Sequence, residues 1–143
     1  MSRLCLSKMV EADVEWFMAC IKTHHYNKGQ LVKYATRFDN LLGREIAKSL
    51  DDRRIIQLDG NRVGSVGIFE RCDGVELSYF LVPEYEGKGI MTRVLSGLLE
   101  ELGERNIECR VLKDNKRSLN LLRRLGFEIE TEDSEMFRVV KKY

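Results

Sequence analysis

The chain has 143 residues, 43% of them hydrophobic, and a single proline, which suits one compact domain over residues 1–143 and argues against disorder. Its 24 basic and 23 acidic residues leave a net charge of +1, so bulk charge gives no support for a nucleic-acid partner or a membrane surface. The four cysteines are far apart, and no apolar run approaches the roughly 20 residues of a membrane span. We therefore expect a soluble cytoplasmic protein with reduced thiols.

The amino-terminal third is predicted to be mainly helical. A short apolar strand at 3–6 precedes apolar residues that recur at helical spacing, which predicts a helix over 12–22. The same spacing predicts a second helix within 24–42 and a third near 41–50.

Three antiparallel strands are expected next, at 54–58, 63–70 and 75–82. The turn residues Asp59-Gly60-Asn61 and Cys72-Asp73-Gly74 separate them. Apolar residues are nearly continuous in the third strand, so we expect it to be buried on both faces and central in a sheet.

The rest of the chain alternates between helices and strands. A helix over 89–102 is followed by a strand at 107–112, a helix at 116–125, and a closing hairpin formed by 127–130 and 135–140. Together the elements predict a mixed α/β fold, with helices layered on a sheet.

The connection between the third strand and the long helix contains two glycines, Gly87 and Gly89. Glycine permits positive φ angles and lets the oxygens of another molecule approach the backbone. The first N–H groups of a helix lack internal partners, and the helix dipole places positive charge there, so a phosphate or pyrophosphate is the natural occupant. The spacing fits neither a P-loop nor the dinucleotide fingerprint, whose third glycine would replace Thr92.

Two segments resemble the signatures of the GNAT N-acetyltransferase superfamily. The first is VPEYEGKGIMT at 82–92, followed by an apolar helix, which resembles the acetyl-CoA-binding segment. The second runs from Asn115-Lys116-Arg117-Ser118 to Leu125-Gly126-Phe127, one helix and one strand further on. Within the superfamily the chain looks closest to the ribosomal-protein N-terminal acetyltransferases and their small relatives.

The resemblance implies a mostly antiparallel sheet of six to seven strands with a splayed pair of strands that holds CoA. It implies transfer of an acetyl group from acetyl-CoA to an amine by direct attack on the thioester. The acceptor would be an amine-bearing small molecule or a peptide or protein N-terminus, and the protein a monomer or homodimer. The implied CoA-binding residues are Phe80, Leu81, Val82, Glu86, Gly87, Lys88, Gly89, Ile90, Met91, Thr92, Asn115 and Ser118.

Two residues are candidates for proton transfer. Glu76 interrupts the apolar strand where the family has a catalytic carboxylate, which suits a general base, and the alternative is a strand-end carboxylate paired with a neighbouring arginine. Ser118 is the candidate acid for the leaving thiolate, because the tyrosine that many family members carry four residues later is Leu122 here. The alternative for Ser118 is an ordinary first helical turn capped by Asn115.

Other features leave alternatives open. Glu86 stands where the superfamily usually has Arg or Gln, so this residue and Leu122 keep open a CoA-binding regulatory or partner module that has lost catalysis. The basic helix at 116–124 raises a nucleic-acid-binding domain as a third hypothesis, against which stand the neutral overall charge and the lack of an aromatic stacking platform. A partner for the 3′-phosphate of CoA could be among six basic residues, and the alternative is that most of them belong to a solvated helix face. These residues are Lys88, Lys113, Lys116, Arg117, Arg123 and Arg124.

The two histidines, His24 and His25, are adjacent, and Cys20 stands four residues before the first. No second ligand pair completes a metal site, so we expect loop residues and no metal. His25 and Tyr26 are also candidates for lining the acceptor site, within the region 13–52 that we expect to form much of its wall.

Overall fold

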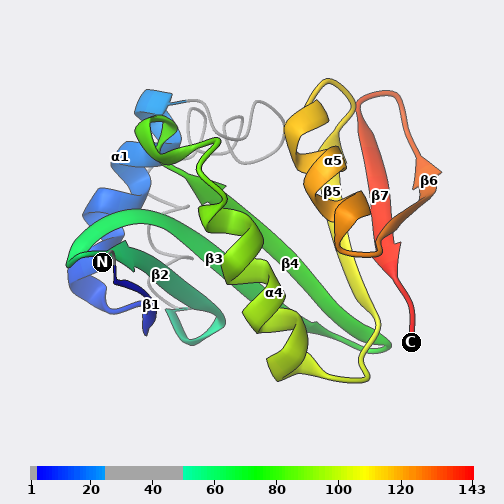
Figure 1. Cartoon of the computed structure of the whole chain (residues 1–143), viewed down its shortest axis with the longest axis horizontal. Helices are drawn as coiled ribbons and strands as arrows, with labels where there is room; N and C mark the ends of the chain where they lie inside the picture. The colour runs from blue at the N-terminus through cyan, green and yellow to red at the C-terminus, as the bar shows by residue number, and fades with distance from the viewer. Residues whose placement is uncertain (1–2, 25–49) are drawn as a thin grey trace. The chain divides into compact units, whose positions relative to one another are not determined.

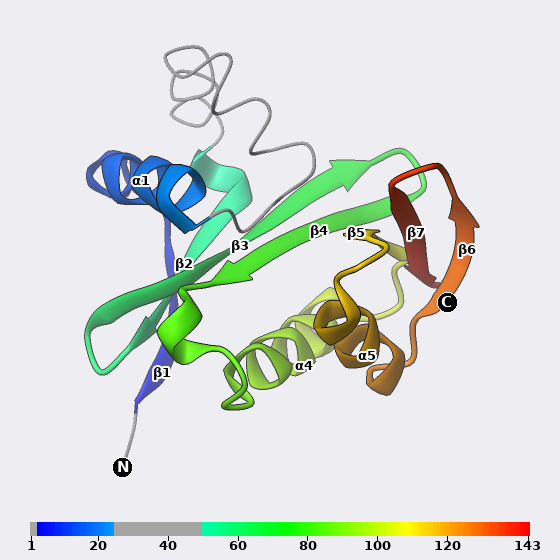
Figure 2. The ribbon, with the colours of Figure 1, turned by 90° about the horizontal axis from the view of Figure 1, so that it is seen from above.

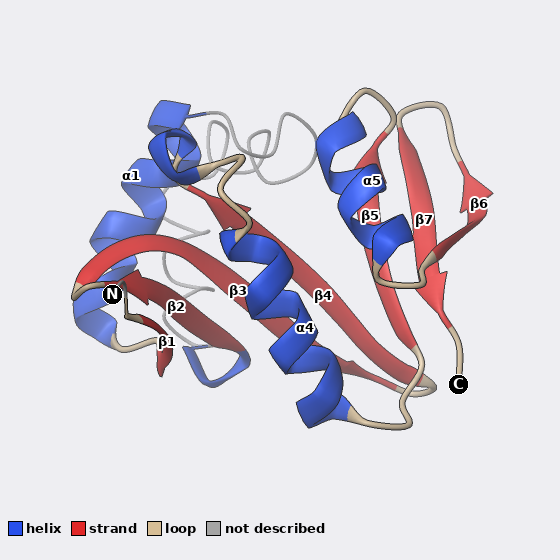
Figure 3. Cartoon of the chain, in the orientation of Figure 1, coloured by secondary structure: helices blue, strands red, loops and turns tan. Residues whose placement is uncertain are grey.

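Seven strands form one sheet in the order β1-β2-β3-β4-β5-β7-β6, flanked by helices (Figures 1 and 3). The computed structural model describes residues 3–24 and 50–143. The helices predicted within 24–42 and near 41–50 lie outside the described residues, apart from the end residues His24 and Leu50. The described elements are β1 (Leu4–Lys8), η1 (Glu11–Asp13), α1 (Val14–His24), η2 (Leu50–Asp52), β2 (Arg53–Leu58), β3 (Asn61–Arg71), β4 (Gly74–Leu81), η3 (Pro83–Tyr85), α4 (Ile90–Leu102), β5 (Ile107–Leu112), α5 (Lys116–Arg124), β6 (Glu128–Glu132) and β7 (Met136–Lys141).

The sheet is mostly antiparallel, as predicted. The pairs β1·β2, β2·β3, β5·β7 and β6·β7 are antiparallel, and β4 pairs with β5 in parallel. The register of that parallel pair covers Val75–Leu77 against Ile107–Cys109, although both strands continue beyond it. This short register agrees with the splayed pair of strands implied by the resemblance.

β4 is the fourth of the seven strands, so the prediction of a central strand is confirmed. The prediction that it is buried on both faces is wrong for its first half. Val75 and Leu77 are buried on one face, whereas Glu76 and Ser78 alternate with them and are half-buried on the other. Phe80 and Leu81, which follow, are both buried. The polar side chains at every second position keep one face of the strand accessible.

The chain divides into two compact units, of which the first comprises Met1–Gly67 and Tyr79–Lys88. Its hydrophobic core confirms the apolar face predicted for α1. The Phe80 ring stacks on Trp16 with a centroid distance of 6.0 Å and meets Phe17 edge-on at 5.5 Å. The buried members of this core are Met9, Phe17, Cys20, Ile21, Ile55 and Phe80.

Two glycines shape the backbone of this first unit. The turn between β2 and β3 has positive φ at both Asp59 (53°) and Gly60 (84°), as tight two-residue hairpin turns require. An added Cβ at Gly64 would overlap the carbonyl oxygen of Phe80, so glycine permits the close approach of β3 to β4.

The second unit comprises Ile68–Ser78 and Gly89–Tyr143. Figure 2 shows α4 and α5 on one side of the strands of this unit. Glycines bound α4 at both ends, with φ of 78° at Gly89 and 62° at Gly103, as the sequence predicted. The side chains that α4 buries are Ile90, Met91, Val94, Leu95 and Leu98.

Candidate active site

The turn before α4 exposes its backbone. Gly87 and Gly89 have φ of 75° and 78°, in the left-handed region that favours glycine. Residues 86–89 are all exposed, and a Cβ built on either glycine meets no heavy atom of residues 3–24 and 50–143 within 4 Å. A ligand oxygen can therefore approach the main chain here without displacing a side chain.

The helix that follows presents N–H donors. Gly89 is its N-cap and makes no side-chain capping hydrogen bond, and the Arg93 N–H donates to the Gly89 carbonyl at 3.2 Å. The N–H groups of Ile90, Met91 and Thr92 precede that bond and have no partner within the helix. This donor set at the positive end of the helix dipole fits a pyrophosphate. Because the side chains of Ile90 and Met91 are buried in the core, these two residues would bind through their backbones.

Glu86 and Lys88 flank Gly87 with opposite charges. The Glu86 N–H donates to the Pro83 carbonyl at 3.1 Å and so closes η3, and a CoA contact of Glu86 stays a prediction. The exposed Lys88 ammonium lies 5.6 Å from the centre of the Tyr85 ring.

The end of β4 and the residue after it include three of the predicted CoA-binding residues, Phe80, Leu81 and Val82. The Val82 N–H donates to the Val63 carbonyl at 2.7 Å and so joins the strand end to β3. The side chains of Phe80 and Leu81 are buried. Any contact of Phe80 and Leu81 with CoA would accordingly be made by their backbones, and these contacts stay predictions.

Glu76 lies on the half-exposed face of β4 and is paired with Arg71. The Nη2 and Nε atoms of Arg71 donate to Oε1 of Glu76 at 2.7 Å and 3.2 Å. The Glu76 side chain is 22% exposed. The alternative that the sequence left open, a carboxylate paired with a neighbouring arginine, is confirmed, and the role of general base stays a prediction.

Asn115 caps α5. Its Oδ1 accepts a hydrogen bond from the Ser118 N–H at 3.2 Å, so the capped first turn that the sequence offered as an alternative is confirmed. Ser118 itself is half-buried. The CoA contact of Asn115 and the acid role of Ser118 stay predictions.

Replacing Asn115 by Ala should lower the free energy of unfolding by about 1 kcal/mol, because the Ser118 N–H loses its cap. Urea denaturation measures this loss, with Asn120→Ala on the exposed side of α5 as the control. Acetyl-CoA affinity measured under folding conditions separates the two roles of Asn115. A cap alone predicts unchanged affinity, whereas a CoA contact predicts weaker binding. An unchanged free energy of unfolding would contradict the capping role.

Comparison with known proteins decides the family. The family described as "Acetyltransferase (GNAT) domain" matches residues 3–128. The chain belongs to the GNAT acetyltransferase family. The resemblance to the ribosomal-protein N-terminal acetyltransferases within this family stays a prediction.

Curated proteins from Escherichia coli are similar to this chain in sequence. The spermidine N(1)-acetyltransferase of Escherichia coli is 26% identical over 111 residues, which cover 73% of this chain and 60% of that enzyme. This GNAT chain thus spans about 60% of the length of the curated relatives it matches.

Two solved structures share the fold. The PaiA N-acetyltransferase of Thermoplasma acidophilum, in complex with coenzyme A, has a TM-score of 0.71 and 21% identity, covering 99% of each chain. Mutant forms of the spermidine/spermine N-acetyltransferase of Vibrio cholerae have a TM-score of 0.71 and 17% identity, covering 96% of this chain and 92% of that one.

The basic residues considered as partners of the 3′-phosphate are mostly exposed. Lys113 lies 3.6 Å from the Glu132 carboxylate and over the Phe137 ring. The side chains of Lys116, Arg117, Arg123 and Arg124 are exposed. A solvated face of α5 accounts for these four residues, and a partner for the 3′-phosphate among them stays a prediction.

Within residues 3–24 and 50–143, no three His, Cys, Asp or Glu side chains are placed to hold a metal ion. Burial, with the nearby Glu84 carboxylate, raises the pKa of Cys20 to about 11, so its thiol stays protonated at neutral pH and is a poor ligand. His25 and Tyr26 lie outside the described residues. No helix in the described part of the chain is long and apolar enough to cross a membrane.

Sequence reasoning offered an arginine partner for Glu76 as an alternative but did not identify it as Arg71. The two residues flank the turn between β3 and β4, so the hairpin register brings them close. The sequence signal for this pair was the predicted hairpin, because cross-strand neighbours near a turn lie close enough to form an ion pair.

Proposed function

We propose that this chain transfers the acetyl group of acetyl-CoA to an amine by direct attack of the amine on the thioester. The observation that supports this most is the open glycine turn that leads into α4, found in a chain of the GNAT family. The pyrophosphate of CoA would bind the N–H groups of Ile90, Met91 and Thr92. The pantetheine arm would hydrogen-bond to the main chain of β4 as an added strand does.

The protein must assist the reaction in three ways: it stabilises the oxyanion, removes a proton from the amine, and supplies a proton to the thiolate. As the amine nitrogen bonds to the carbonyl carbon, a backbone N–H around Phe80 stabilises the negative charge on the oxygen. Glu76 accepts the proton that the amine loses, directly or through a water molecule. The C–S bond then breaks, and the departing thiolate takes a proton from Ser118 or from water.

The acceptor that we favour is a small-molecule amine, because the curated relatives are named as spermidine acetyltransferases. A peptide or protein N-terminus is the other acceptor class, in line with the resemblance to the ribosomal-protein enzymes. An α-amine, with a pKa of about 7.7–8.0, is partly neutral at pH 7, whereas an alkylamine with a pKa of about 10.4 depends more on a base.

A second candidate function is a CoA-binding module without catalysis. Leu122 occupies the position where many family members carry an acidic tyrosine, and its side chain is 0% exposed. It packs in the core and supplies no proton. A chain with this residue can retain the CoA-binding turn and lack the usual acid.

Saturating acetyl-CoA should raise the thermal midpoint of unfolding, because a ligand that binds only the folded state stabilises it. ATP, which shares the adenine nucleotide and lacks the pantetheine arm, is the control ligand. No shift with any CoA ester would contradict both candidate functions. If acetyl-CoA binds, thiol release with spermidine, simple diamines and short peptides with free N-termini separates them, since the module predicts binding without turnover.

A further inference from the structure

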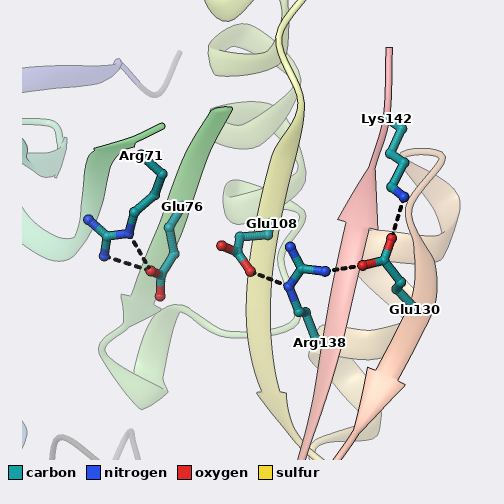
Figure 4. A network of polar contacts seen from close by, with 6 residues as sticks. All are labelled: Arg71, Glu76, Glu108, Glu130, Arg138 and Lys142. Carbon is teal, nitrogen blue, oxygen red and sulfur yellow. Dashed lines mark hydrogen bonds and ion pairs between the residues drawn. The ribbon is translucent and has the colours of Figure 1, made fainter. Parts of the chain in front are cut away.

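Charged side chains form a row across the strands of the second unit (Figure 4). Arg71 at the end of β3 pairs with Glu76 on β4. On the neighbouring strands, Arg138 of β7 bonds both Glu108 of β5 and Glu130 of β6, and Lys142 also bonds Glu130. Glu76 and Glu108 stand opposite each other in the parallel register of β4 and β5.

The Arg71 guanidinium is held by its own strand as well as by Glu76. Its Nη1 donates to the Glu70 carbonyl at 3.2 Å, and its Cζ lies 5.7 Å from the centre of the Phe69 ring. The guanidinium therefore has contacts on its own strand that do not depend on Glu76. These contacts and its planar shape favour one direction of approach to the Glu76 carboxylate.

The two oxygens of Glu76 are used differently. Both hydrogen bonds from Arg71 go to Oε1. Among the residues that the structure describes, none donates a hydrogen bond to Oε2. The side chain is 22% exposed, so the Glu76 carboxylate is not sealed from solvent.

Glu108 does not compete for the same arginine. Its Oε2 accepts a hydrogen bond from Arg138 Nε at 2.6 Å, so each of the two facing carboxylates has its own guanidinium. The thiol of Cys109, buried beside them, has a pKa raised by burial and by both carboxylates, so it stays protonated and adds no charge. Arg71 is thus the cation that acts on Glu76.

We propose that Arg71 is a positioning residue, which holds Oε1 of Glu76 so that Oε2 points to the amine, or to the water that relays its proton. This inference rests on the proposed function, in which Glu76 is the base. An exposed ion pair contributes little to stability, and the Arg71 side chain is 47% exposed. The importance of the pair is therefore expected in the reaction rate and not in folding.

The test compares Arg71→Gln, Arg71→Lys and Arg105→Gln in the full chain. Arg105 is the matched control, since its side chain has a comparable exposure, 38% against 47% for Arg71, and pairs with a carboxylate, Glu70, in the same unit. Arg71→Gln should lower kcat about tenfold with little change in the KM for acetyl-CoA, because a misdirected base costs rate and not cofactor binding. Arg71→Lys should recover part of the rate, and Arg105→Gln should match the wild type.

Combining Arg71→Gln with Glu76→Gln shows whether the arginine acts through the carboxylate. The double variant should be no slower than Glu76→Gln alone, because the arginine then has no base to orient. Losses that multiply, or a kcat of Arg71→Gln equal to that of the wild type while Glu76→Gln is impaired, would overturn this inference alone. A wild type without turnover on any amine would overturn the proposed function and this inference together.

NMR supplies a readout that does not require turnover. The Nε–H of Arg71 should exchange with water more slowly in the wild type, where its acceptor is the Glu76 carboxylate, than in Glu76→Ala, where that acceptor is removed. Equal exchange rates would show that the pair does not form in solution and would overturn the inference.

Discussion

Replacing Glu76 by Gln should lower kcat on the order of 100-fold, the lower end of what general-base catalysis contributes. Glutamine preserves the size of the side chain and a hydrogen-bond acceptor for Arg71, but it cannot take up the proton of the attacking amine. The affinity for acetyl-CoA should not change, because the predicted CoA contacts are the turn at Gly87 and Gly89 and the N-terminus of α4. Single-turnover thiol release and equilibrium titration with acetyl-CoA measure the two quantities separately.

Glu70→Gln is the matched control for this substitution. Glu70 is a carboxylate near the end of β3 that pairs with Arg105 and has no part in the proposed reaction. Its replacement should leave kcat within about twofold of the wild type, as expected of an exposed ion pair. If Glu76→Gln turns over as fast as the wild type across the pH range, Glu76 is not the base. That result would not affect the proposal that CoA binds at the glycine turn.

The elements that the sequence predicted well are those set by local pattern. The range 107–112 predicted for a strand is that of β5, and the helix predicted over 89–102 differs from α4 by one residue. Helical spacing and a glycine at each end define α4 without reference to the rest of the fold. The closing hairpin was predicted one or two residues early, since short polar strands such as β6 carry little periodicity.

The features that sequence reasoning missed depend on packing and hydrogen-bond partners, which only the three-dimensional fold determines. The one-sided burial of β4 is visible in the alternation of Glu76 and Ser78, but the apolar residues around them suggested a fully buried strand. The hydrogen bond from the Glu86 N–H to Pro83 arises from the single turn of η3, which no periodicity marks. The hydrogen bonds of Arg71 to one oxygen of Glu76 require coordinates, because a hairpin register places strands and not carboxylate oxygens.

Replacing Gly89 by Ala should weaken acetyl-CoA binding about tenfold or more. A φ of 78° strains any L side chain, and the added Cβ meets no atom of the described part of the chain within 4 Å. The methyl group would instead meet a bound ligand, at the point where the backbone is proposed to approach the pyrophosphate. Losing one hydrogen bond to a charged group costs about 1.5–3 kcal/mol, which corresponds to the expected loss of affinity.

Gly60→Ala separates backbone strain from ligand contact. Gly60 has a φ of 84°, and its added Cβ also meets nothing within 4 Å, but it lies in the turn between β2 and β3. Both variants should lose about 1–2 kcal/mol of folding free energy, the cost of a left-handed residue with a Cβ. Only Gly89→Ala should lose affinity in calorimetric titration with acetyl-CoA. Equal affinities for the two variants would place the pyrophosphate away from this turn, and the N-terminus of α4 would then need another role.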